Sequence, residues 1–156
     1  MNQLEIREDD LTGQKIADLL QEHLKNMHEI TPPESIHALD IEALRSPNIT
    51  FWTAWESDRD ELLGCGALKE LDARNGEVKS MRTAKAHRRR GVASKILEHI
   101  IKEAKRRAYD CLNLETGAFP EFAPARALYL RYGFEYRGPF AEYIDDPNSV
   151  FMTKKL

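Results

Sequence analysis

The stretch KAHRRRGVASKI, residues 85–96, places three consecutive arginines directly before a glycine and an apolar run. Residues 77–83, before this stretch, are predicted to form a strand, and residues 92–108 carry apolar side chains at the spacing of an amphipathic helix. The first N–H groups of such a helix lack intrahelical acceptors and lie at the positive end of its dipole. Gly91 lets the backbone approach a ligand closely. We therefore predict that this loop binds a small anion; the alternative is a solvated basic start of a helix.

Around this stretch, the periodicity of apolar residues predicts one mixed α/β domain over residues 1–156, in the order β-α-α-β-β-β-α-β-α-β-β. Strands are expected near residues 4–6, 49–55, 62–71, 77–83, 111–115, 134–137 and 150–152. Helices are expected from Thr12 to the break at Thr31-Pro32-Pro33, and near residues 36–44, 92–108 and 124–132. The pair Asn75-Gly76 is typical of a hairpin turn before the fourth strand.

The composition argues against several classes of protein. The formal net charge is −3, whereas dedicated nucleic-acid-binding domains are usually strongly positive. Basic residues are nevertheless concentrated, because residues 85–107 hold nine Lys or Arg and only two Glu. Cys65 and Cys111 lack the spacing of zinc ligands and are expected to be reduced and buried, so neither a disulfide nor a metal site is predicted. No stretch approaches the roughly 18 apolar residues of a membrane span, so we expect a soluble, cytoplasmic protein without membrane association.

Two motifs in this sequence resemble those of the GNAT superfamily of acyl-CoA-dependent N-acyltransferases. Arg88-Arg89-Arg90-Gly91-Val92-Ala93 matches the pattern Gln/Arg-x-x-Gly-x-Gly/Ala, and Ala125-x-x-Leu128-Tyr129-x-x-x-Gly133-Phe134 resembles a later helix of the superfamily. The order of elements also agrees across nearly the whole chain. The resemblance implies a GNAT-type α/β (α+β mixed) fold. Its central mixed, mostly antiparallel sheet would have about seven strands, with strands 4 and 5 splayed apart and about four flanking helices.

By this resemblance the protein is an N-acetyltransferase that uses acetyl-CoA as co-substrate and no metal. The acceptor would be a primary amine of a small molecule or an amino-acid-like compound, which attacks the thioester directly. The loop 88–94 would bind the coenzyme pyrophosphate, and the strand end Met81–Thr83 would pair with the pantetheine arm. Coenzyme contacts are thereby implied for Met81, Arg82, Thr83, Arg88, Arg89, Arg90, Gly91, Val92, Ala93, Ser94, Phe122, Ala125 and Tyr129. Phe122 stands where many members carry an asparagine, so that contact with pantetheine must be made differently or lost.

The reaction needs a base for the amine, a donor for the oxyanion and an acid for the leaving thiolate. The resemblance gives Tyr129 the role of the acid; its alternative is a core tyrosine on an amphipathic helix. Glu77 is the first candidate for the base, because several members carry a glutamate eleven residues before the position of Arg88. Its alternative is a solvated glutamate after a turn, and Glu115 is a second candidate for the base. The oxyanion donor is implied to be a backbone N–H near Met81.

In the superfamily, the loop after the first helix commonly forms a wall of the acceptor pocket. The candidate acceptor-binding residues are His28, Glu29, Glu34, His37, Glu115 and Tyr143. Acidic side chains in these loops would suit a cationic amine, opposite the basic coenzyme end. The alternative is a polar surface loop without a binding role.

Two other functions fit the sequence. The first is an acyl-CoA-binding sensor with the same fold and no turnover. The second is a nucleic-acid-binding module that uses the basic segment Lys85–Arg107, although this segment lacks the aromatic side chains that stack on bases. We expect no nucleic-acid partner. Homodimers are frequent in the superfamily, so a homodimer is a further expectation, for which no residue pattern specifies an interface.

Overall fold

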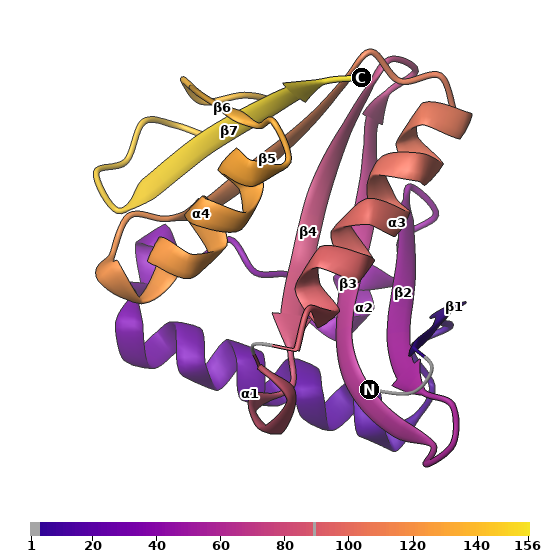
Figure 1. The fold of residues 1–156 in the computed structure, drawn as a ribbon. Helices are drawn as coiled ribbons and strands as arrows, with labels where there is room; N and C mark the ends of the chain where they lie inside the picture. Colours follow the sequence, from indigo (N-terminus) through magenta and orange to yellow (C-terminus); the bar gives the residue numbers. More distant parts are fainter. Residues whose placement is uncertain (1–3, 89) are drawn as a thin grey trace.

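A seven-stranded sheet in the order β1-β2-β3-β4-β5-β7-β6 runs through the molecule (Figure 1). The computed structural model describes residues 4–88 and 90–156. Neighbouring strands pair antiparallel except β4 and β5, which are parallel, so the predicted mixed, mostly antiparallel sheet is confirmed. The strands are β1 (Leu4–Glu8), β2 (Ile49–Glu56), β3 (Glu61–Asp72), β4 (Asn75–Thr83), β5 (Cys111–Gly117), β6 (Glu135–Arg137) and β7 (Ser149–Lys155). The helices are α1 (Gln14–Ile30), α2 (Ile41–Leu44), α3 (Val92–Arg106) and α4 (Ala123–Arg131), with short 3-10 turns η1 (Pro33–Ser35), η2 (Lys85–His87) and η3 (Pro120–Phe122).

The central strands are buried on both faces, because consecutive side chains of a strand point to opposite sides of the sheet. Trp52 and Leu63 pack with α3 in one core, whereas Phe51 and Leu62 pack with α1 in the other. Figure 1 shows this arrangement, with α3 in front of β3 and β4 and with α1 and α2 behind them. The predicted apolar stripe of α3 is confirmed, since Val92, Ile96 and Ile100 are almost completely buried.

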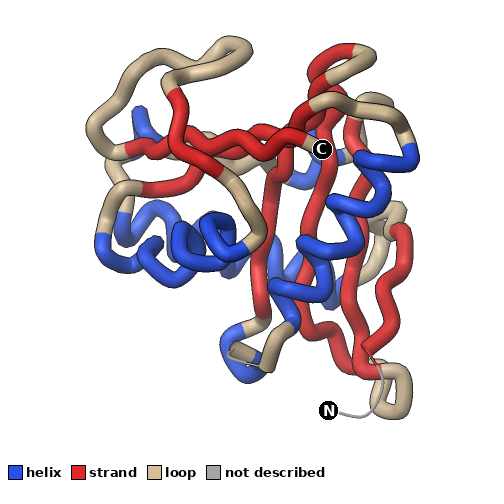
Figure 2. The backbone as a smooth tube through the Cα atoms, turned by 45° about the horizontal axis from the view of Figure 1, so that its top comes forward, coloured by secondary structure: helices blue, strands red, loops and turns tan. Residues whose placement is uncertain are grey.

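The parallel pairing of β4 with β5 is short. It covers only the pairs Asn75–Cys111, Gly76–Leu112 and Glu77–Asn113, after which the two strands separate. Strand β5 instead pairs with β7 along its whole length. Figures 1 and 2 show the two parts of the sheet diverging beyond this point. The predicted splay between the fourth and fifth strands is therefore confirmed, and it begins at Glu77.

A β-bulge lies in β4 just beyond the point of separation. Cys65 pairs with Arg82 and Ala67 pairs with Lys79, so Gly66 faces both Ser80 and Met81. Ser80 adopts the left-handed backbone region with φ of 55°, which is uncommon for a residue with a side chain. The Cys65 thiol donates a hydrogen bond to the Ser80 carbonyl at 3.2 Å. The bulge thus interrupts the ladder where the strand has lost its β5 neighbour.

Several element boundaries differ from those expected. The helix expected over 36–44 is a single turn, because Asp40 caps it by accepting a hydrogen bond from the Ala43 N–H. The hairpin turn before β4 is centred on residues 73–74 rather than on Asn75-Gly76, since the Asp72 carboxylate accepts from the Arg74 N–H. Thr12 does not cap α1, whose N-cap is Gly13. Both cysteines are free as expected, but only Cys65 is buried and Cys111 is half-buried.

The close packing of β3 against β4 predicts a large cost for a side chain at Gly64. A Cβ atom there would lie 2.6 Å from the Arg82 carbonyl oxygen, so the backbone would have to shift. We expect Gly64→Ala to lower the free energy of unfolding by about 1–3 kcal/mol, measured by urea denaturation. Gly138→Ala is the matched control, because a Cβ at Gly138 meets nothing within 4 Å. Equal stability of the two variants would contradict the packing described for β3 and β4.

Candidate functional site

The splay between β4 and β5 holds a cavity of about 130 Å³. Its walls come from both strands, from the second half of α1, from the segment after η1 and from the start of α4. The residues that line it are His23, Met27, His37, Ala38, Glu77, Val78, Lys79, Ser80, Met81, Glu115, Thr116, Gly117, Phe122, Ala125 and Tyr129. Sequence positions more than a hundred residues apart therefore meet at one point.

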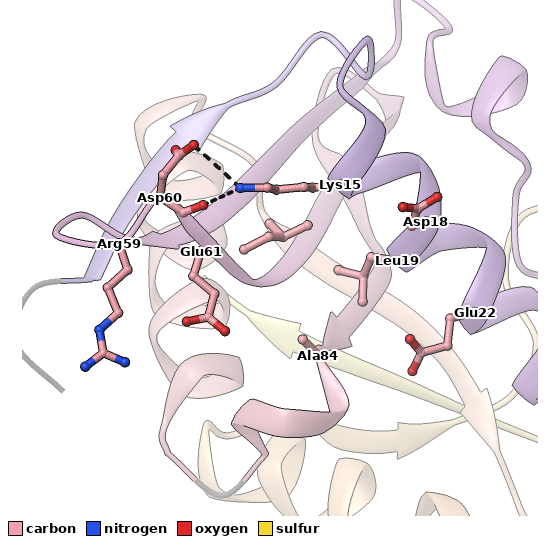
Figure 3. Close-up of a pocket in the computed structure, with 9 residues that line it drawn as sticks. Lys15, Asp18, Leu19, Glu22, Arg59, Asp60, Glu61 and Ala84 are labelled. Atoms are coloured by element: carbon pink, nitrogen blue, oxygen red, sulfur yellow. Dashed lines mark hydrogen bonds and ion pairs between the residues drawn. The ribbon is translucent and has the colours of Figure 1, made fainter.

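A second cavity of about 430 Å³ lies between α1, the β2–β3 hairpin and the end of β4 (Figure 3). Its charged groups are exposed: the side chains of Lys15 and Asp60, which form an ion pair of 3.5 Å, are 56% and 75% exposed. Functional sites are recognised by converging polar groups with perturbed pKa values rather than by size. The smaller cavity in the splay has these properties, so we identify it as the candidate site.

Glu77 lies at the point of separation and takes part in a buried hydrogen-bond network. The Tyr143 hydroxyl donates to Glu77 Oε2 at 2.5 Å, and Lys79 Nζ donates to the same oxygen at 3.2 Å. Lys79 also donates to the Tyr143 hydroxyl oxygen at 3.0 Å. The side chains of Glu77 and Lys79 are only 3% and 8% exposed, so the ion pair between them is shielded from water. We call these three residues the Glu77–Lys79–Tyr143 network; in it, one carboxylate oxygen of Glu77 already accepts two bonds.

Glu115 lies across the cavity in a different environment. Burial raises the pKa of Glu115 to about 7, because removal from water penalises the carboxylate, while the nearby Lys79 acts in the opposite direction. His37 is affected by the same surroundings: burial lowers its pKa, and Lys79 lowers it further. The cavity therefore holds a carboxyl group that changes its charge near neutral pH and a histidine that favours the neutral form.

Tyr129 lines the cavity from the last turn of α4. Its ring contacts Phe134 edge to face at 5.6 Å, and the hydroxyl forms no hydrogen bond to any residue that the structure describes. Burial, and secondarily the charge of Glu115, raises the pKa of Tyr129, so the hydroxyl stays protonated at neutral pH. Phe122, the N-cap of α4, lies so close to β5 that a Cβ on Gly117 would be 2.2 Å from its ring. The site therefore offers a protonated, unpartnered hydroxyl beside an aromatic wall.

Helix α1 contributes two lining residues that the sequence did not indicate. His23 and Met27 are four residues apart and so lie on one face of the helix. Burial lowers the pKa of His23 to about 4, which keeps the ring neutral. Lys79 was also missed, although its i, i+2 spacing from Glu77 places both on one face of the strand and was a usable signal.

Three of the predicted acceptor-binding residues lie outside the cavity. His28 and Glu29 are exposed in the last turn of α1, and Glu34 is exposed in η1. The reason is the helical period, because His28 lies one residue beyond Met27 and is therefore rotated by about 100° away from the lining face. Of the remaining predictions, His37 and Glu115 line the cavity, and Tyr143 reaches it through Glu77.

Two loops close the cavity on the side of Tyr143. The Ser35 hydroxyl donates to Asp146 Oδ2 at 2.6 Å and accepts from Asn148 Nδ2 at 3.2 Å. The rings of His37 and Tyr143 also meet edge to face at 5.0 Å. These contacts join the segment after α1 to the segment between β6 and β7, so the wall of the cavity is built from both.

The loop before α3 has the features of an anion site. Gly91 is the N-cap of α3 in the left-handed region with φ of 79°, and no side chain caps the helix. The first turn carries no acidic residue. Arg88 is exposed and forms no hydrogen bond or ion pair within residues 4–88 and 90–156, whereas Arg90 donates to His87. Arg89 lies outside the described residues.

The other predicted coenzyme residues are spread along two elements. Val92 is buried in the core, so only its backbone is available, while Ala93 and Ser94 are half-buried in the first turn of α3. Thr83 pairs with Gly64 at the end of β4. The Arg82 side chain turns toward α1, where it donates to Asn26 at 3.4 Å and to Glu22 at 3.3 Å. Its guanidinium is therefore engaged within the protein.

Four described basic residues of the segment Lys85–Arg107 form ion pairs: Arg90, Lys95, Arg106 and Arg107. Glu103 accepts from Arg106 at 2.6 Å and from Arg107 at 2.8 Å. Lys95 lies 3.9 Å from Glu98.

No group of His, Cys, Asp and Glu suited to hold a metal ion occurs in the described part of the chain. No helix among residues 4–88 and 90–156 is both long and apolar enough to cross a membrane.

Comparison with known proteins gives consistent results. The sequence profile of the Acetyltransferase (GNAT) family matches residues 14–134. The chain is 60% identical to the uncharacterized N-acetyltransferase YsnE of Bacillus subtilis (strain 168), over 98% of this chain and 100% of that protein. It is 48% identical to the uncharacterized N-acetyltransferase YedL of Escherichia coli (strain K12), over 97% and 94%. An IAA acetyltransferase of Azospirillum brasilense is 37% identical over 90% of each chain.

Solved structures agree with the fold. A structure from Klebsiella pneumoniae subsp. pneumoniae MGH 78578 has a TM-score of 0.79 and 28% identity, over 98% of this chain and 97% of the other. A GNAT family acetyltransferase from Elizabethkingia anophelis with acetyl-CoA bound has a TM-score of 0.67 over the whole of both chains. At 19% identity, this second likeness concerns the fold alone.

The Glu77–Lys79–Tyr143 network predicts that the Tyr143 hydroxyl stabilises the fold. We expect Tyr143→Phe to lower the free energy of unfolding by about 1.5–3 kcal/mol, because a hydrogen bond to a buried charged group is lost. Urea denaturation at neutral pH measures this change. Tyr136→Phe is the control, since Tyr136 is 57% exposed, and it should change stability by less than about 0.5 kcal/mol. A Tyr143→Phe protein as stable as this control would contradict the network.

Proposed function

This chain belongs to the acetyltransferase (GNAT) family and is an acetyl-CoA-dependent N-acetyltransferase; from this premise we propose that it acetylates a primary amine of a small molecule or an amino-acid-like acceptor. The amine nitrogen would attack the thioester carbon directly, and the carbon–sulfur bond would then break. One observation carries the proposal: the cavity in the splay brings together the free hydroxyl of Tyr129 and the carboxyl group of Glu115. These are an acid and a base suited to neutral pH.

The loop before α3 is proposed to hold the coenzyme. Three features favour binding of a pyrophosphate: free N–H groups in the first turn of α3, the absence of acidic residues there, and Arg88, which has no partner among the described residues. The segment Met81–Thr83 has no β5 neighbour, so its backbone groups are available to an amide-bearing arm. Phe122 and Ala125 would contact the same arm from the other side of the splay. A backbone N–H near Met81, beside the bulge, is the proposed donor to the oxyanion.

Glu115 is the proposed base. It lies at the cavity with its pKa raised to about 7 by burial, so at neutral pH a substantial fraction is ionised and able to accept a proton from the acceptor ammonium. Glu77, the first candidate in the sequence, is less suited because its Oε2 already accepts from Tyr143 and Lys79. Glu77 is therefore proposed to hold Lys79 and Tyr143 in place. Two carboxyl groups on one face of the sheet would thus have different roles, set by their surroundings.

Tyr129 is proposed to protonate the leaving sulfur. The hydroxyl makes no hydrogen bond to the described residues, and its raised pKa keeps the proton in place until a thiolate develops beside it. As the carbon–sulfur bond breaks, negative charge develops on the sulfur, and the hydroxyl can share its proton with the sulfur in the transition state. The packing of the ring against Phe134 holds the hydroxyl in one orientation.

The acceptor is proposed to be a cationic amine, held by Glu115 and enclosed by His37 and the loop of Tyr143. Apart from the Glu77–Lys79 pair, which is neutral as a unit, Glu115 is the only acidic group among the described residues that line the cavity. One ammonium group would therefore balance the charge of the site. The predicted roles of His28, Glu29 and Glu34 receive no support, because these residues lie on the outer surface.

The proposed function is tested by calorimetry followed by an assay of thiol release. Titration with acetyl-CoA should show binding, whereas short duplex DNA should show none; the reverse would favour the nucleic-acid-binding alternative. A panel of cationic, neutral and anionic amines, together with IAA because one relative is an IAA acetyltransferase, should then release coenzyme A with cationic amines. Binding without thiol release for any acceptor would favour a sensor. The expected homodimer stays a prediction, which sedimentation of the same sample measures.

The assignment of the base predicts a distinct pH dependence. The base acts when ionised, so kcat/KM should fall as the pH falls below the pKa of Glu115, about 7. We expect Glu115→Gln to lower kcat/KM by about a hundredfold and to remove this acidic limb. Glu77→Gln should keep the limb, and Glu42→Gln, on exposed α2, is the control. If Glu77→Gln removes the limb and Glu115→Gln keeps it, Glu77 is the base.

A further inference from the structure

His87 lies in the loop between β4 and α3 and is buried, with 8% of its side chain exposed. Both ring nitrogens have partners. Nε2 lies 2.8 Å from Glu61 Oε1, and Nδ1 lies 2.7 Å from Arg90 Nη1. Within the described residues, His87 is therefore joined to residues on both sides of it: to the β2–β3 hairpin and to the start of α3.

The partners determine where the imidazole carries its proton. An arginine side chain can only donate, so Nδ1 of His87 must accept the hydrogen bond from Arg90. The proton is then on Nε2, which donates to the Glu61 carboxylate. Without Glu61, no acceptor would hold the proton on Nε2. The proton could then move to Nδ1, and the hydrogen bond from Arg90 would be lost. We call Glu61, His87 and Arg90 the loop brace.

The brace is anchored in a rigid part of the fold. Glu61 opens β3 and pairs in register with Glu56, the last residue of β2. Arg90 Nη2 lies 4.0 Å from Glu56, so both strands of the hairpin contact the loop, each at the end next to the turn. Figure 3 shows Glu61 and Ala84, which follows β4 at the start of the loop, lining the same cavity. The Ala84 N–H donates to the Leu63 carbonyl at 2.8 Å, and the His87 N–H donates to the Ala84 carbonyl at 2.8 Å.

We propose that Glu61 and His87 are positioning residues for the coenzyme, because they hold Arg90 and thereby place Gly91 and the first turn of α3 where they bind the pyrophosphate. Arg90 acts by bracing the loop, and Arg88, exposed and without a partner in the described chain, is the cation left for the phosphates. A loop held in place before binding loses less conformational entropy when the ligand arrives. The inference rests on the proposed role of this loop in coenzyme binding.

The test separates coenzyme binding from chemistry. We expect His87→Leu and Glu61→Leu to raise the KM for acetyl-CoA and the Kd for coenzyme A about tenfold, with kcat and the acceptor KM unchanged, because the loop must be ordered on binding. Glu61→Gln should stay close to wild type, since its amide oxygen can still accept from Nε2. Glu42→Leu, on exposed α2, is the matched control.

The outcomes distinguish a failure of the proposed function of the loop from a failure of the loop brace alone. Absence of coenzyme A binding to the wild-type protein contradicts the proposed function of the loop and the brace with it. Wild-type binding with no change in any variant contradicts the brace alone, as does a fall in kcat that accompanies changes in both KM values. If His87→Leu does not fold, the pair Glu61→Leu and Glu61→Gln decides, because the Glu61 side chain is 44% exposed and tolerates replacement.

Discussion

The early end of the β4–β5 pairing is the constraint on which the rest of the site depends. Strands β4 and β5, which α3 connects, pair in parallel only as far as Glu77 and Asn113. The Asn113 side chain secures this last rung, because its amide donates to the Gly76 carbonyl at 3.2 Å and its oxygen accepts from Arg137 at 2.9 Å. Beyond it, β4 still pairs with β3, but the edge that faced β5 has no strand neighbour. Backbone groups on this edge need a partner, which the amide-bearing arm of the coenzyme is proposed to supply.

The side chains around the splay give the carboxyl groups of Glu77 and Glu115 different surroundings. Glu77 is hydrogen-bonded and ion-paired, so it stabilises the enclosure of Lys79 and Tyr143. Glu115 is half-buried, and the removal of its carboxyl group from water raises its pKa to about 7 against the opposing effects of Ser149 and Lys79. In the proposed function, this raised pKa lets Glu115 accept a proton near neutral pH. The hydrogen bond between Ser35 and Asp146 joins the two loops on this side of the cavity.

Three neighbouring arginines illustrate how tertiary contacts separate residues that the sequence presents as equivalent. Arg90 donates to His87 and lies near the Glu56 carboxylate of the hairpin, whereas Arg88 is exposed without a partner among the described residues. Arg89 lies outside the described residues. Charge alone would assign both described arginines to phosphate binding. A buried histidine with two partners instead makes one of them part of the scaffold.

The sequence by itself determined the mixed α/β class, because the apolar stripe of α3 and the apolar runs of the strands are local properties. The splay followed from the resemblance of two motifs to the GNAT superfamily, and coenzyme binding by the loop before α3 stays a proposal. Only the tertiary structure showed that Glu77 is engaged, because this depends on Tyr143, which lies 66 residues later in the chain and donates to its carboxylate. It also separated His37 from His28, because the last turn of α1 directs His28 to the surface, whereas the segment after η1 brings His37 against Tyr143 at the cavity. Hydrogen-bond partners and burial are properties of the packed chain, so no local pattern specifies them.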